Sequence, residues 1–369
     1  MTHRCALGLI SGTSADGVTT AVINIDESNK KKPVELIAHR TYPYPAQLRR
    51  RVLAAVDMKT PEISRLNFEL GEFFARAAGD EVRRLKIKNP KLSVEIIGSH
   101  GQTIYHGPDD RPANTLQIGE PAIIAERLGL PVIADFRPGD MAAGGQGAPL
   151  APFFDWFRFH RLAPVICLNI GGIANITIVS EKPEHVIAFD TGPGNCLMDL
   201  AVSLSTRGRM AYDQDGRRAG RGTIDDAALR RACGHAYFLK NPPKSTGREL
   251  FNQNFLERGF GKIKRIEDKL ATLAALTAET ISTAIKKFPR SPVLASGGGV
   301  HNLLLMKLLK ERLPGHPIAP TDHYGVHAEA KEAMAFALMA WCAWRGRPNH
   351  LPQTTGATGK PQILGKLIT

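Results

Sequence analysis

Two stretches of this chain repeat one pattern of apolar and polar positions. Apolar runs flank the turn 11–17 (SGTSADG), and similar apolar runs flank the turn 169–175 (NIGGIAN). Two apolar runs joined by turn residues are typical of paired strands. Glycine lets backbone N–H groups converge, and Ser, Thr and Asn add donors, so both turns are suited to hold phosphate oxygens. The repeat therefore predicts two related lobes that hold one polyphosphate.

The remaining pattern alternates between short strand-like runs and helical periodicity. Residues 63–85, for example, place Leu66, Leu70 and Phe74 on one stripe of a helix. Strands alternating with helices, with a hairpin opening each half, predict an α/β fold of two lobes with mixed sheets and flanking helices around a duplicated core. Beyond the hairpins, strands are expected at 34–42, 94–97, 116–118, 132–134, 186–189, 292–295 and 316–318, and helices at 45–55, 63–85, 120–128, 152–159, from about 196 onward, 225–233, 268–287, 302–312 and 329–345.

The length of 369 residues is sufficient for two domains of ordinary size. We place an N-terminal lobe at 1–140, which contains the first hairpin. The last helix, near 329–345, is expected to pack back on this lobe. A C-terminal lobe at 141–369 contains the second hairpin.

Composition and charge narrow the class of partner. The chain is 43% hydrophobic and 22% charged, with a formal net charge of +13. Its Lys and Arg residues are spread out, and the short runs 30–32 and 49–51 are not interleaved with aromatics, so a solvated surface is favoured over nucleic-acid binding. The longest apolar run, 333–344, is shorter than the ~20 residues of a membrane span. The five cysteines show no metal-ligand spacing. We expect a cytoplasmic protein with neither nucleic-acid nor membrane partners.

The first turn is a candidate phosphate site. Its amides and hydroxyls would hold the β- and γ-phosphates of a nucleotide, while Asp16 would orient Mg²⁺ directly or through water. The alternative is a hairpin turn that is rich in Ser, Thr and Asp for conformational reasons alone. Seven consecutive turn residues exceed what a two-residue hairpin loop needs, and the second turn repeats the pattern, so we favour the phosphate site.

Asp190 is the best-defined candidate for a functional residue. It ends an apolar strand, and Gly192, Pro193 and Gly194 then turn the chain into a helix. This order places the carboxylate at the edge of a sheet where open α/β folds bind ligands, and it aims free N–H groups of a helix N-terminus at the same place. A simple helix cap is the alternative, but a cap would lie next to the first helical turn. We expect a functional carboxylate.

Other segments leave two interpretations open. The glycine run 297–299 would let a flat ligand such as adenine approach the backbone, or would serve only as a flexible connection. A loop containing His100 would orient a sugar hydroxyl or supply a base, or would hold the histidine in a structural hydrogen bond. Arg137 and Asp140 flank a Pro-Gly pair, and they would either contact the substrate or form a surface salt bridge with each other. Glu332 would either belong to a functional site or be the solvated end of a helix. The segment 242–249 would be a loop that caps a helix.

Taken together, these segments resemble the anhydro-N-acetylmuramic acid kinases, a branch of the actin/hexokinase-like ATPase superfamily with its ribonuclease H-like fold. The resemblance runs through nearly the whole chain. It rests on SGTSADG at 11–17, GSHGQTIYHGP at 98–108, LQIGEPAIIAE at 116–126, ADFRPGDMAAGGQGAPL at 134–150, NIGGIANIT at 169–177, FDTGPGNCLMD at 189–199, PPKSTGRELFN at 242–252, SGGGVHN at 296–302 and KEAMAFA at 331–337.

The resemblance implies a cytoplasmic homodimer that takes ATP, Mg²⁺ and a 1,6-anhydro sugar, in the recycling of cell-wall peptidoglycan. It implies a catalytic role for Asp190 and a substrate-positioning role for Glu332, with Asp16 toward the metal. The residues expected to bind ATP are Gly12, Thr13, Ser14, Ala15, Asp16, Gly17, Val18, Thr19, Gly171, Gly172, Gly297, Gly298 and Gly299. The residues expected to bind the sugar are His100, Gln102, Thr103, Arg137, Asp140, Asn169 and Asn195.

The implied chemistry differs from that of an ordinary sugar kinase. In the anhydro sugar, O6 already belongs to the internal bridge, so no hydroxyl has to be deprotonated. Ionised Asp190 would instead activate a water for attack at C1, and the departing O6 would be captured by the γ-phosphorus of ATP. The phosphate and aspartate motifs are shared with kinases of levoglucosan, so that substrate stays an alternative. A nucleotide-dependent regulator on the same fold is a further alternative, disfavoured because Asp190 is present and no DNA-binding extension is visible.

Three positions depart from the usual family pattern. Ala15 stands where a larger apolar residue is common, and His327 where proline is common. Pro138 and Gly139 replace a pair that often includes a further arginine. The loss of that cation bears on how the lactyl carboxylate of a muramic sugar is held.

Overall fold

The computed structural model describes residues 3–12, 14–242 and 244–369, with side chains from residue 5 onward. The chain forms two compact units. The first unit comprises Met1–Arg161 and Gly325–Thr369, and the second comprises Leu162–Tyr324. The division therefore falls after residue 161 and not at 140. The segment 141–161 stays with the first unit because its helix α5 (Ala151–Phe159) packs on α12 (Lys331–Trp344).

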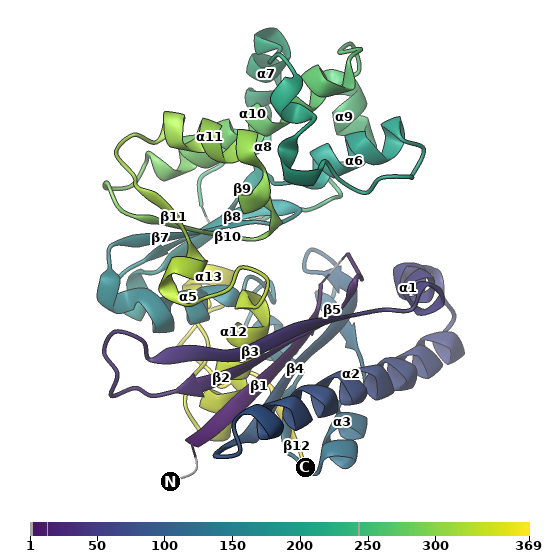
Figure 1. Cartoon of the computed structure of the whole chain (residues 1–369), viewed down its shortest axis with the longest axis vertical. Coiled ribbons are helices and arrows are strands. Elements are labelled where there is room, and N and C mark those ends of the chain that lie inside the picture. The colour runs from purple at the N-terminus through teal and green to yellow at the C-terminus, as the bar shows by residue number, and fades with distance from the viewer. Residues whose placement is uncertain (1–2, 13, 243) are drawn as a thin grey trace. The chain divides into compact units, whose positions relative to one another are not determined.

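The first unit is built on a mixed sheet (Figure 1). The order of its main strands is β12-β6-β4-β1-β2-β3, and β5 pairs with β4. β1 runs antiparallel to β2 and parallel to β4, which is parallel to β6. The strands are β1 (His3–Ser11), β2 (Gly17–Ile25), β3 (Val34–Pro43), β4 (Leu92–Gly107), β5 (Asn114–Ile118), β6 (Val132–Ala134) and β12 (Lys366–Ile368).

The second unit repeats this topology. Its sheet has the order β11-β10-β7-β8-β9, with β7 antiparallel to β8, β8 antiparallel to β9, and β10 parallel to both β7 and β11. These strands are β7 (Val165–Ile170), β8 (Ile173–Val179), β9 (Ile187–Pro193), β10 (Val293–Ser296) and β11 (Ile318–Pro320). Each hairpin thus supplies the first two strands of one sheet, in the same order and direction. This confirms the expected fold class with its duplicated core.

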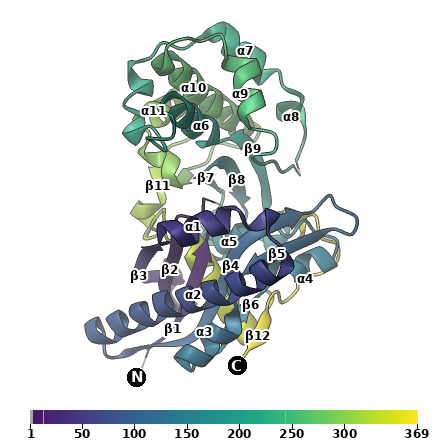
Figure 2. The same cartoon turned by 90° about the vertical axis from the view of Figure 1, so that its right-hand side faces the viewer.

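Two long helices cover opposite faces of the first sheet. α2 (Thr60–Lys88) packs with Leu7 and Leu9 of β1 in one apolar cluster, whereas the intervening Gly8 lies against α12. Side chains alternate across a strand, so residues 7 and 9 face one way and residue 8 the other. Figure 1 labels both helices, and Figure 2 shows α2 from the side turned by 90°. The remaining helices of this unit are α1 (Ala46–Leu53), α3 (Pro121–Leu128), α4 (Phe136–Ala142), α5 and α13 (Pro352–Thr355).

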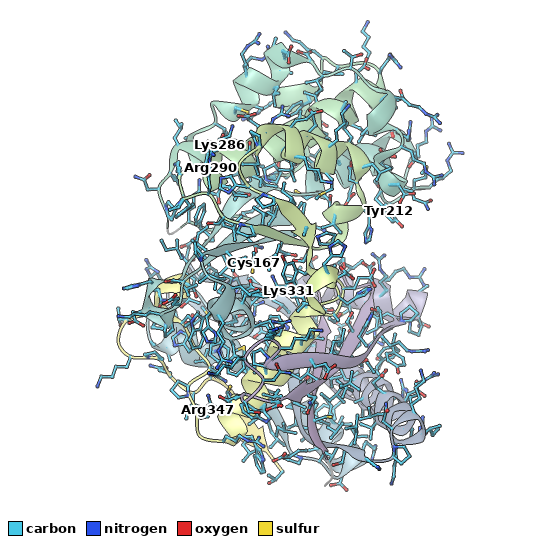
Figure 3. All side chains as sticks on the ribbon, turned by 60° about the vertical axis from the view of Figure 1, so that its left-hand side comes forward. Cys167, Tyr212, Lys286, Arg290, Lys331 and Arg347 are labelled. Atoms are coloured by element: carbon cyan, nitrogen blue, oxygen red, sulfur yellow. The ribbon has the colours of Figure 1, made fainter. Side chains whose placement is uncertain are left out.

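A buried ion pair fixes the beginning of α12. The Lys331 ammonium lies 2.8 Å from the Asp155 carboxylate of α5, and both side chains are almost fully buried. Figure 3 labels Lys331 on α12. Removing one partner of a buried pair leaves an uncompensated charge, so the two helices must keep this contact. It therefore also fixes the position of the next residue, Glu332.

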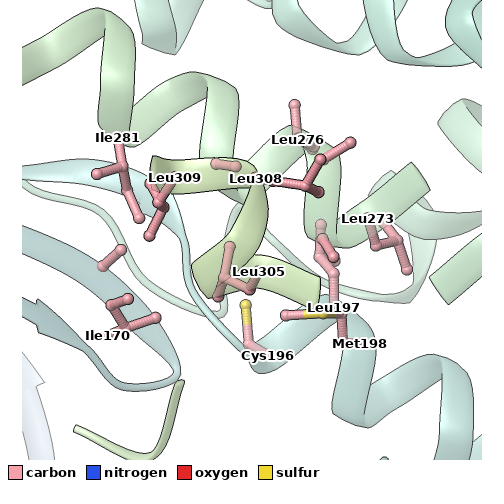
Figure 4. Close-up of a cluster of buried hydrophobic side chains, with 14 of the residues drawn as sticks. Ile170, Cys196, Leu197, Met198, Leu273, Leu276, Ile281, Leu305, Leu308 and Leu309 are labelled. Carbon is pink, nitrogen blue, oxygen red and sulfur yellow. The ribbon is translucent and has the colours of Figure 1, made fainter. Parts of the chain in front are cut away.

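The second unit has a separate apolar core between its sheet and its helices. Leu273, Leu276 and Ile281 of α10 meet Leu305 and neighbours of α11 (Figure 4). Its helices are α6 (Cys196–Ser205), α7 (Asp226–Cys233), α8 (Ala236–Leu239), α9 (Gln253–Phe260), α10 (Ile266–Ile285) and α11 (Leu303–Arg312). Short 3₁₀ segments in the whole chain are η1 (Ala55–Asp57), η2 (His160–Leu162), η3 (Pro183–His185), η4 (Gln214–Gly216), η5 (Ala219–Arg221), η6 (Gly298–His301) and η7 (Thr321–Tyr324).

The structure differs from the sequence-based expectation in two places that matter for function. β4 runs on to residue 107, so the expected loop around His100 is strand, because β5 pairs with this second half. β9 runs on to residue 193, so Asp190 lies within a strand and not at its end. The strand β12 and the helix α9 were not expected. In the described part of the chain, no helix has both the length and the apolar character needed to cross a bilayer.

Candidate functional site

The first turn, residues 12–16, joins β1 to β2. The Ala15 N–H donates to the Gly12 carbonyl at 3.0 Å, and Ala15 is buried with a φ of 50°. Space in front of Gly12 is open, since a Cβ built there would meet no atom within 4 Å. Ser14 and Asp16 are exposed, and Asp16 pairs with Arg49 at 3.1 Å. The turn therefore leaves backbone accessible where a phosphate would bind.

Four more residues of the expected ATP set complete the account of this turn. Thr13 lies outside the described residues. Gly17 is required by close packing, because a Cβ there would lie 2.2 Å from the Tyr42 carbonyl oxygen. Val18 is buried, and the Thr19 hydroxyl lies 3.0 Å from that of Thr41. These three residues therefore belong to the sheet that holds the turn.

Gln102 connects β4 to the first turn. Its side-chain oxygen accepts from the Ser11 hydroxyl at 2.6 Å, and its amide nitrogen donates to the Gly12 carbonyl at 3.2 Å. The residue is 1% exposed. A buried amide satisfied on both sides fixes backbone and has little capacity left for a ligand. Gln102 is therefore placed to position the turn, and the Thr103 hydroxyl beside it accepts from Gln117 at 3.2 Å.

His100, Arg137 and Glu332 come together in the first unit, from β4, α4 and α12. Arg137 Nε donates to His100 Nε2 at 2.9 Å, while His100 Nδ1 lies 3.1 Å from the Gly101 carbonyl oxygen. Nε2 must accept the proton of Arg137, so the neutral histidine carries its own proton on Nδ1. Both ring nitrogens are thus used within the protein. His100 holds Arg137 in place and is not available as a base.

Charge and burial shift the pKa values in this cluster. Burial, helped by the Arg137 charge, holds the pKa of His100 well below its usual range. His106 further along β4 has a pKa lowered to about 4, by burial and then by Arg137. Desolvation lowers the pKa of Arg137 to about 10, against the opposing effect of Glu332. The Glu332 residue is exposed, but protein atoms surround its carboxylate. The resulting desolvation of the carboxylate raises its pKa, and the charges of Arg137 and Lys331 oppose this shift. The cluster presents one cation beside one carboxylate.

Asp140 lies in the interior and not in a surface salt bridge. Its carboxylate accepts from the Thr355 hydroxyl at 2.5 Å and from the Gly147 N–H at 2.6 Å, and His350 Nε2 lies 2.5 Å from it. The side chain is fully buried. Its oxygens are occupied by protein groups, so Asp140 fixes α4, and with it Arg137, and does not itself reach a sugar.

In the second unit, Asp190 is held by the segment 244–246. The Thr246 N–H donates to Asp190 Oδ2 at 2.9 Å, and the Asp190 N–H donates to the Lys244 carbonyl at 3.0 Å. The Tyr237 hydroxyl donates to the Asp190 carbonyl at 2.8 Å. The segment that the sequence predicts as a capping loop therefore lies along the edge strand β9 and fixes the Asp190 carboxylate.

Asp190 titrates close to neutrality. Desolvation raises its pKa to about 6, the Thr246 N–H and the Lys244 charge lower it, and Glu249 raises it. A carboxylate with a pKa near the working pH is well suited to accept a proton from water. It is ionised at pH 7 yet more basic than an ordinary aspartate.

The second turn and the glycine run meet at one edge of the second sheet. Asn169 of β7 pairs with Ser296 of β10, which precedes the glycines. A Cβ on Gly297 would lie 2.7 Å from the Asn169 side-chain oxygen, and one on Gly299 would lie 2.2 Å from Ile170. Only Gly298 leaves open space, with its nearest neighbour at 3.9 Å. Gly297 and Gly299 therefore serve backbone packing, and Gly298 is the one that a flat ligand could approach.

The N-terminus of α6 is already occupied by protein. The N–H groups of Gly194 and Cys196 donate to the Gly172 carbonyl, and that of Asn195 to the Gly171 carbonyl, at 2.8–3.1 Å. The expectation that these first amides are free for a ligand is wrong. They instead fix the second turn against the helix, with the Asn195 side chain donating to the Ile170 carbonyl at 3.2 Å.

Sequence reasoning missed several groups around this site. Asp199 on α6 has a pKa raised to about 7 by desolvation, with Arg248 opposing. The Thr246 hydroxyl is buried without a hydrogen-bond partner in the described part of the chain, although its N–H holds Asp190. The order Lys-Ser-Thr-Gly-Arg at 244–248 was the available signal, but it did not reveal which strand this segment would contact.

The described residues contain no cluster of three or more His, Cys, Asp and Glu side chains that would hold a metal ion by itself. Asp16 is a single exposed carboxylate. That fits Mg²⁺, which commonly takes only one or two protein carboxylates and fills its shell with phosphates and water.

The two sheets share one order of five strands, β3-β2-β1-β4-β6 in the first unit and β9-β8-β7-β10-β11 in the second, with a small-residue turn after the first strand of each copy. This duplicated arrangement is that of the actin/hexokinase-like class of ATPases. Comparison with known proteins is more specific. Residues 4–369 match the profile of the family described as anhydro-N-acetylmuramic acid kinase. The chain belongs to this family.

Individual relatives agree over the full length. The chain is 38% identical to the anhydro-N-acetylmuramic acid kinase of Caldanaerobacter subterraneus subsp. tengcongensis, covering 99% of this chain and 97% of the relative. It is 40% identical to that of a Cyanothece species, covering 98% and 99%. Among solved structures, a ROK family glucokinase from Streptomyces griseus in complex with glucose and AMPPNP aligns with a TM-score of 0.41 at 12% identity, covering 91% of this chain and 99% of that one.

Proposed function

We propose that this protein is an anhydro-N-acetylmuramic acid kinase, which opens the 1,6-anhydro bridge with water and transfers the γ-phosphoryl group of ATP to O6. The product would be N-acetylmuramic acid 6-phosphate. The observation that supports this best, beside family membership, is Asp190: a carboxylate with a pKa of about 6, oriented by a backbone N–H.

In this proposal Asp190 accepts a proton from the water that attacks C1. The C1–O6 bond breaks, and O6 forms a bond to the γ-phosphorus while ADP departs. Water attacks from the face opposite O6, so the reaction inverts C1. No separate acid is needed for the leaving oxygen, because the phosphoryl group takes the place of a proton there.

The first turn, positioned by Gln102, would bind phosphates through its backbone at Gly12 and Ser14. Mg²⁺ would be held by Asp16 together with phosphates and water, and would supply charge neutralisation for phosphoryl transfer. Gly298 would lie against the nucleotide base. Arg137, fixed by His100 and Asp140, would bind an anionic or hydroxyl group of the sugar, and Glu332 beside it a sugar hydroxyl.

Changing Asp190 to Asn tests the proposal. The amide keeps the shape but cannot accept a proton, so we expect kcat to fall by at least about 10²-fold, with ATP affinity nearly unchanged. ADP release and calorimetric titration with ATP are the two measurements. Asp226→Asn, the same change on the exposed helix α7, is the matched control and should behave like wild type. Undiminished turnover in Asp190→Asn would refute the role of this residue.

A levoglucosan kinase is the second candidate, because Pro138 and Gly139 lack the extra arginine common beside Arg137. ADP release measured with each sugar separates the two. A clear preference for the muramic sugar in kcat/KM supports the first candidate, and loss of that preference in Arg137→Gln would assign the lactyl carboxylate to this side chain. We further propose that the protein is cytoplasmic and forms a homodimer. Light scattering coupled to gel filtration would test the homodimer through its molar mass.

A further inference from the structure

A cavity of about 190 Å³ lies in the second unit, beside the strand that carries Asp190. Phe189 and Thr191 of β9 line it, together with residues of α8, α10 and the segment after α8. Asp190, between these two residues, is not among the residues that line the cavity. The cavity is therefore separate from the carboxylate proposed for catalysis.

The lining combines aromatic surface with positive charge. Phe189, Phe238 and Phe288 supply apolar walls, and Lys240, Lys244 and Lys287 bring three ammonium groups to the same space. The charges are close enough to repel, because Lys287 and Lys240 both contribute, after burial, to a lowered pKa of Lys244. Like charges gathered in this way favour an anionic ligand that would relieve their repulsion.

Protein groups leave most of this positive charge uncompensated. The acidic residue in the lining, Glu279, already accepts from Arg312 at 3.0 Å. Within the described ranges, neither Lys240 nor Lys287 forms an ion pair, and both are exposed. The cavity thus has a net positive lining that remains accessible to a small molecule.

We propose that this cavity is a binding site for a small organic anion with one flat apolar ring, distinct from the sites of ATP and sugar. Its volume is below the ~300–1,000 Å³ of pockets for drug-sized ligands, which limits the apolar part to about one ring. The ring would pack among the phenylalanines, and the carboxylate or phosphate would face the lysines.

The same segment connects this cavity to Asp190. Lys244 lines the cavity, its carbonyl accepts from the Asp190 N–H, and its ammonium donates to the Tyr237 and Phe238 carbonyls at 3.3 and 3.4 Å. Thr246, two residues on, holds the Asp190 carboxylate. An anion that draws Lys244 into the cavity therefore changes the surroundings of Asp190. This coupling between the cavity and Asp190 goes beyond the proposed function. Binding of the anion in the cavity does not depend on the coupling.

The test uses 4-fluorobenzoate as the probe and ¹⁹F NMR as the readout, on the full chain without ATP or sugar. We expect saturable line broadening with wild type. Lys287→Gln should weaken binding about threefold to fivefold, the size of one partly solvated charge interaction. Lys286→Gln changes the neighbouring lysine, which does not line the cavity, and should leave binding unchanged. Figure 3 labels Lys286.

Any of the following results would overturn the proposal. One is equal weakening by Lys286→Gln and Lys287→Gln, which would show a non-specific charge effect. Another is displacement of the probe by saturating ATP or anhydro sugar, which would place it in the active site. The third is no saturable broadening at millimolar probe, or equal binding of uncharged 4-fluorobenzamide. Because no turnover is measured, failure here leaves the proposed kinase activity untouched.

Discussion

At the scale of single residues, the proposed mechanism depends on how burial and hydrogen bonds shift a few pKa values. Asp190 and His100 move in opposite directions for the same reason, since desolvation favours the neutral form of each. For Asp190 this creates a stronger base. For His100 it keeps a neutral ring that can accept from Arg137.

The pKa of Asp190 predicts the acid limb of the pH profile. In the proposed mechanism Asp190 acts in its ionised form, and its pKa is raised to about 6. Activity is therefore full above this pH and falls tenfold per pH unit below it. In plots of kcat/KM against pH we expect the break near 6, and a break near 4 would contradict the role assigned to desolvation.

Two neighbouring variants should move this break in opposite directions. Glu249 raises the pKa of Asp190, so Glu249→Gln should shift the break to lower pH. Lys244 lowers that pKa, so Lys244→Gln should shift the break to higher pH. Equal shifts of the same sign would point to another titrating group.

At the scale of elements, close packing of α12 on β1 and β4 is what brings Glu332 to the first unit's site. Gly8 and Gly98 allow this approach, since a Cβ on either would collide with backbone of α12. The hydrophobic pattern of 333–344 indicated a buried helix, but which strands it covers depends on these two glycines.

Changing Gly8 to Ala should destabilise the first unit by about 2 kcal/mol or more, because the new Cβ would lie 1.8 Å from the Ala333 carbonyl oxygen. Urea unfolding measures the change, followed by tryptophan fluorescence, which reports the first unit, and by far-UV circular dichroism, which reports both units. Gly259→Ala is the matched control, because in α9 a Cβ would meet nothing within 4 Å. That variant should be neutral or up to about 1 kcal/mol more stable. Similar losses in both variants would contradict the packing argument.

At the scale of the whole molecule, the two units differ in whether one continuous segment of the chain forms them. The second unit is one uninterrupted segment with its own core, whereas the first needs residues 325–369 to return and supply α12 and β12. Trp156, Trp341 and Trp344 all belong to the first unit. Tryptophan fluorescence therefore reports the first unit alone, while far-UV circular dichroism reports both.

The fragment 162–324 should fold by itself with a cooperative thermal transition, because its apolar cluster draws only on its own residues. Circular dichroism measures this. The fragment 1–324 should lose the cooperative fluorescence transition of the full chain, since α12 is missing from the first sheet. A fragment 162–324 that unfolds without cooperativity would show that its core depends on the first unit.

Local sequence alone was sufficient for the duplicated hairpins and most helices. These features depend on periodicity and turn chemistry, which act between neighbours along the chain. The full extent of β4 was not predictable, because Gly98 and Gly101 look like loop residues until β1 and β6 pair with the first half of the strand and β5 pairs with the second half. The same holds for Asp140, which looks like a surface acid until Thr355 and His350 arrive from more than 200 residues away.

By itself, the sequence determined the class of fold and the family, and it indicated Asp190 as the candidate catalytic carboxylate. Only the tertiary structure decided what each candidate does. It turned His100, Gln102 and Asp140 from ligand groups into supports for Arg137 and the phosphate turn, and it made the segment 244–246 the holder of Asp190. The physical reason is that burial and hydrogen-bond saturation depend on residues distant in the chain, and these two properties determine whether a polar side chain remains available to a ligand.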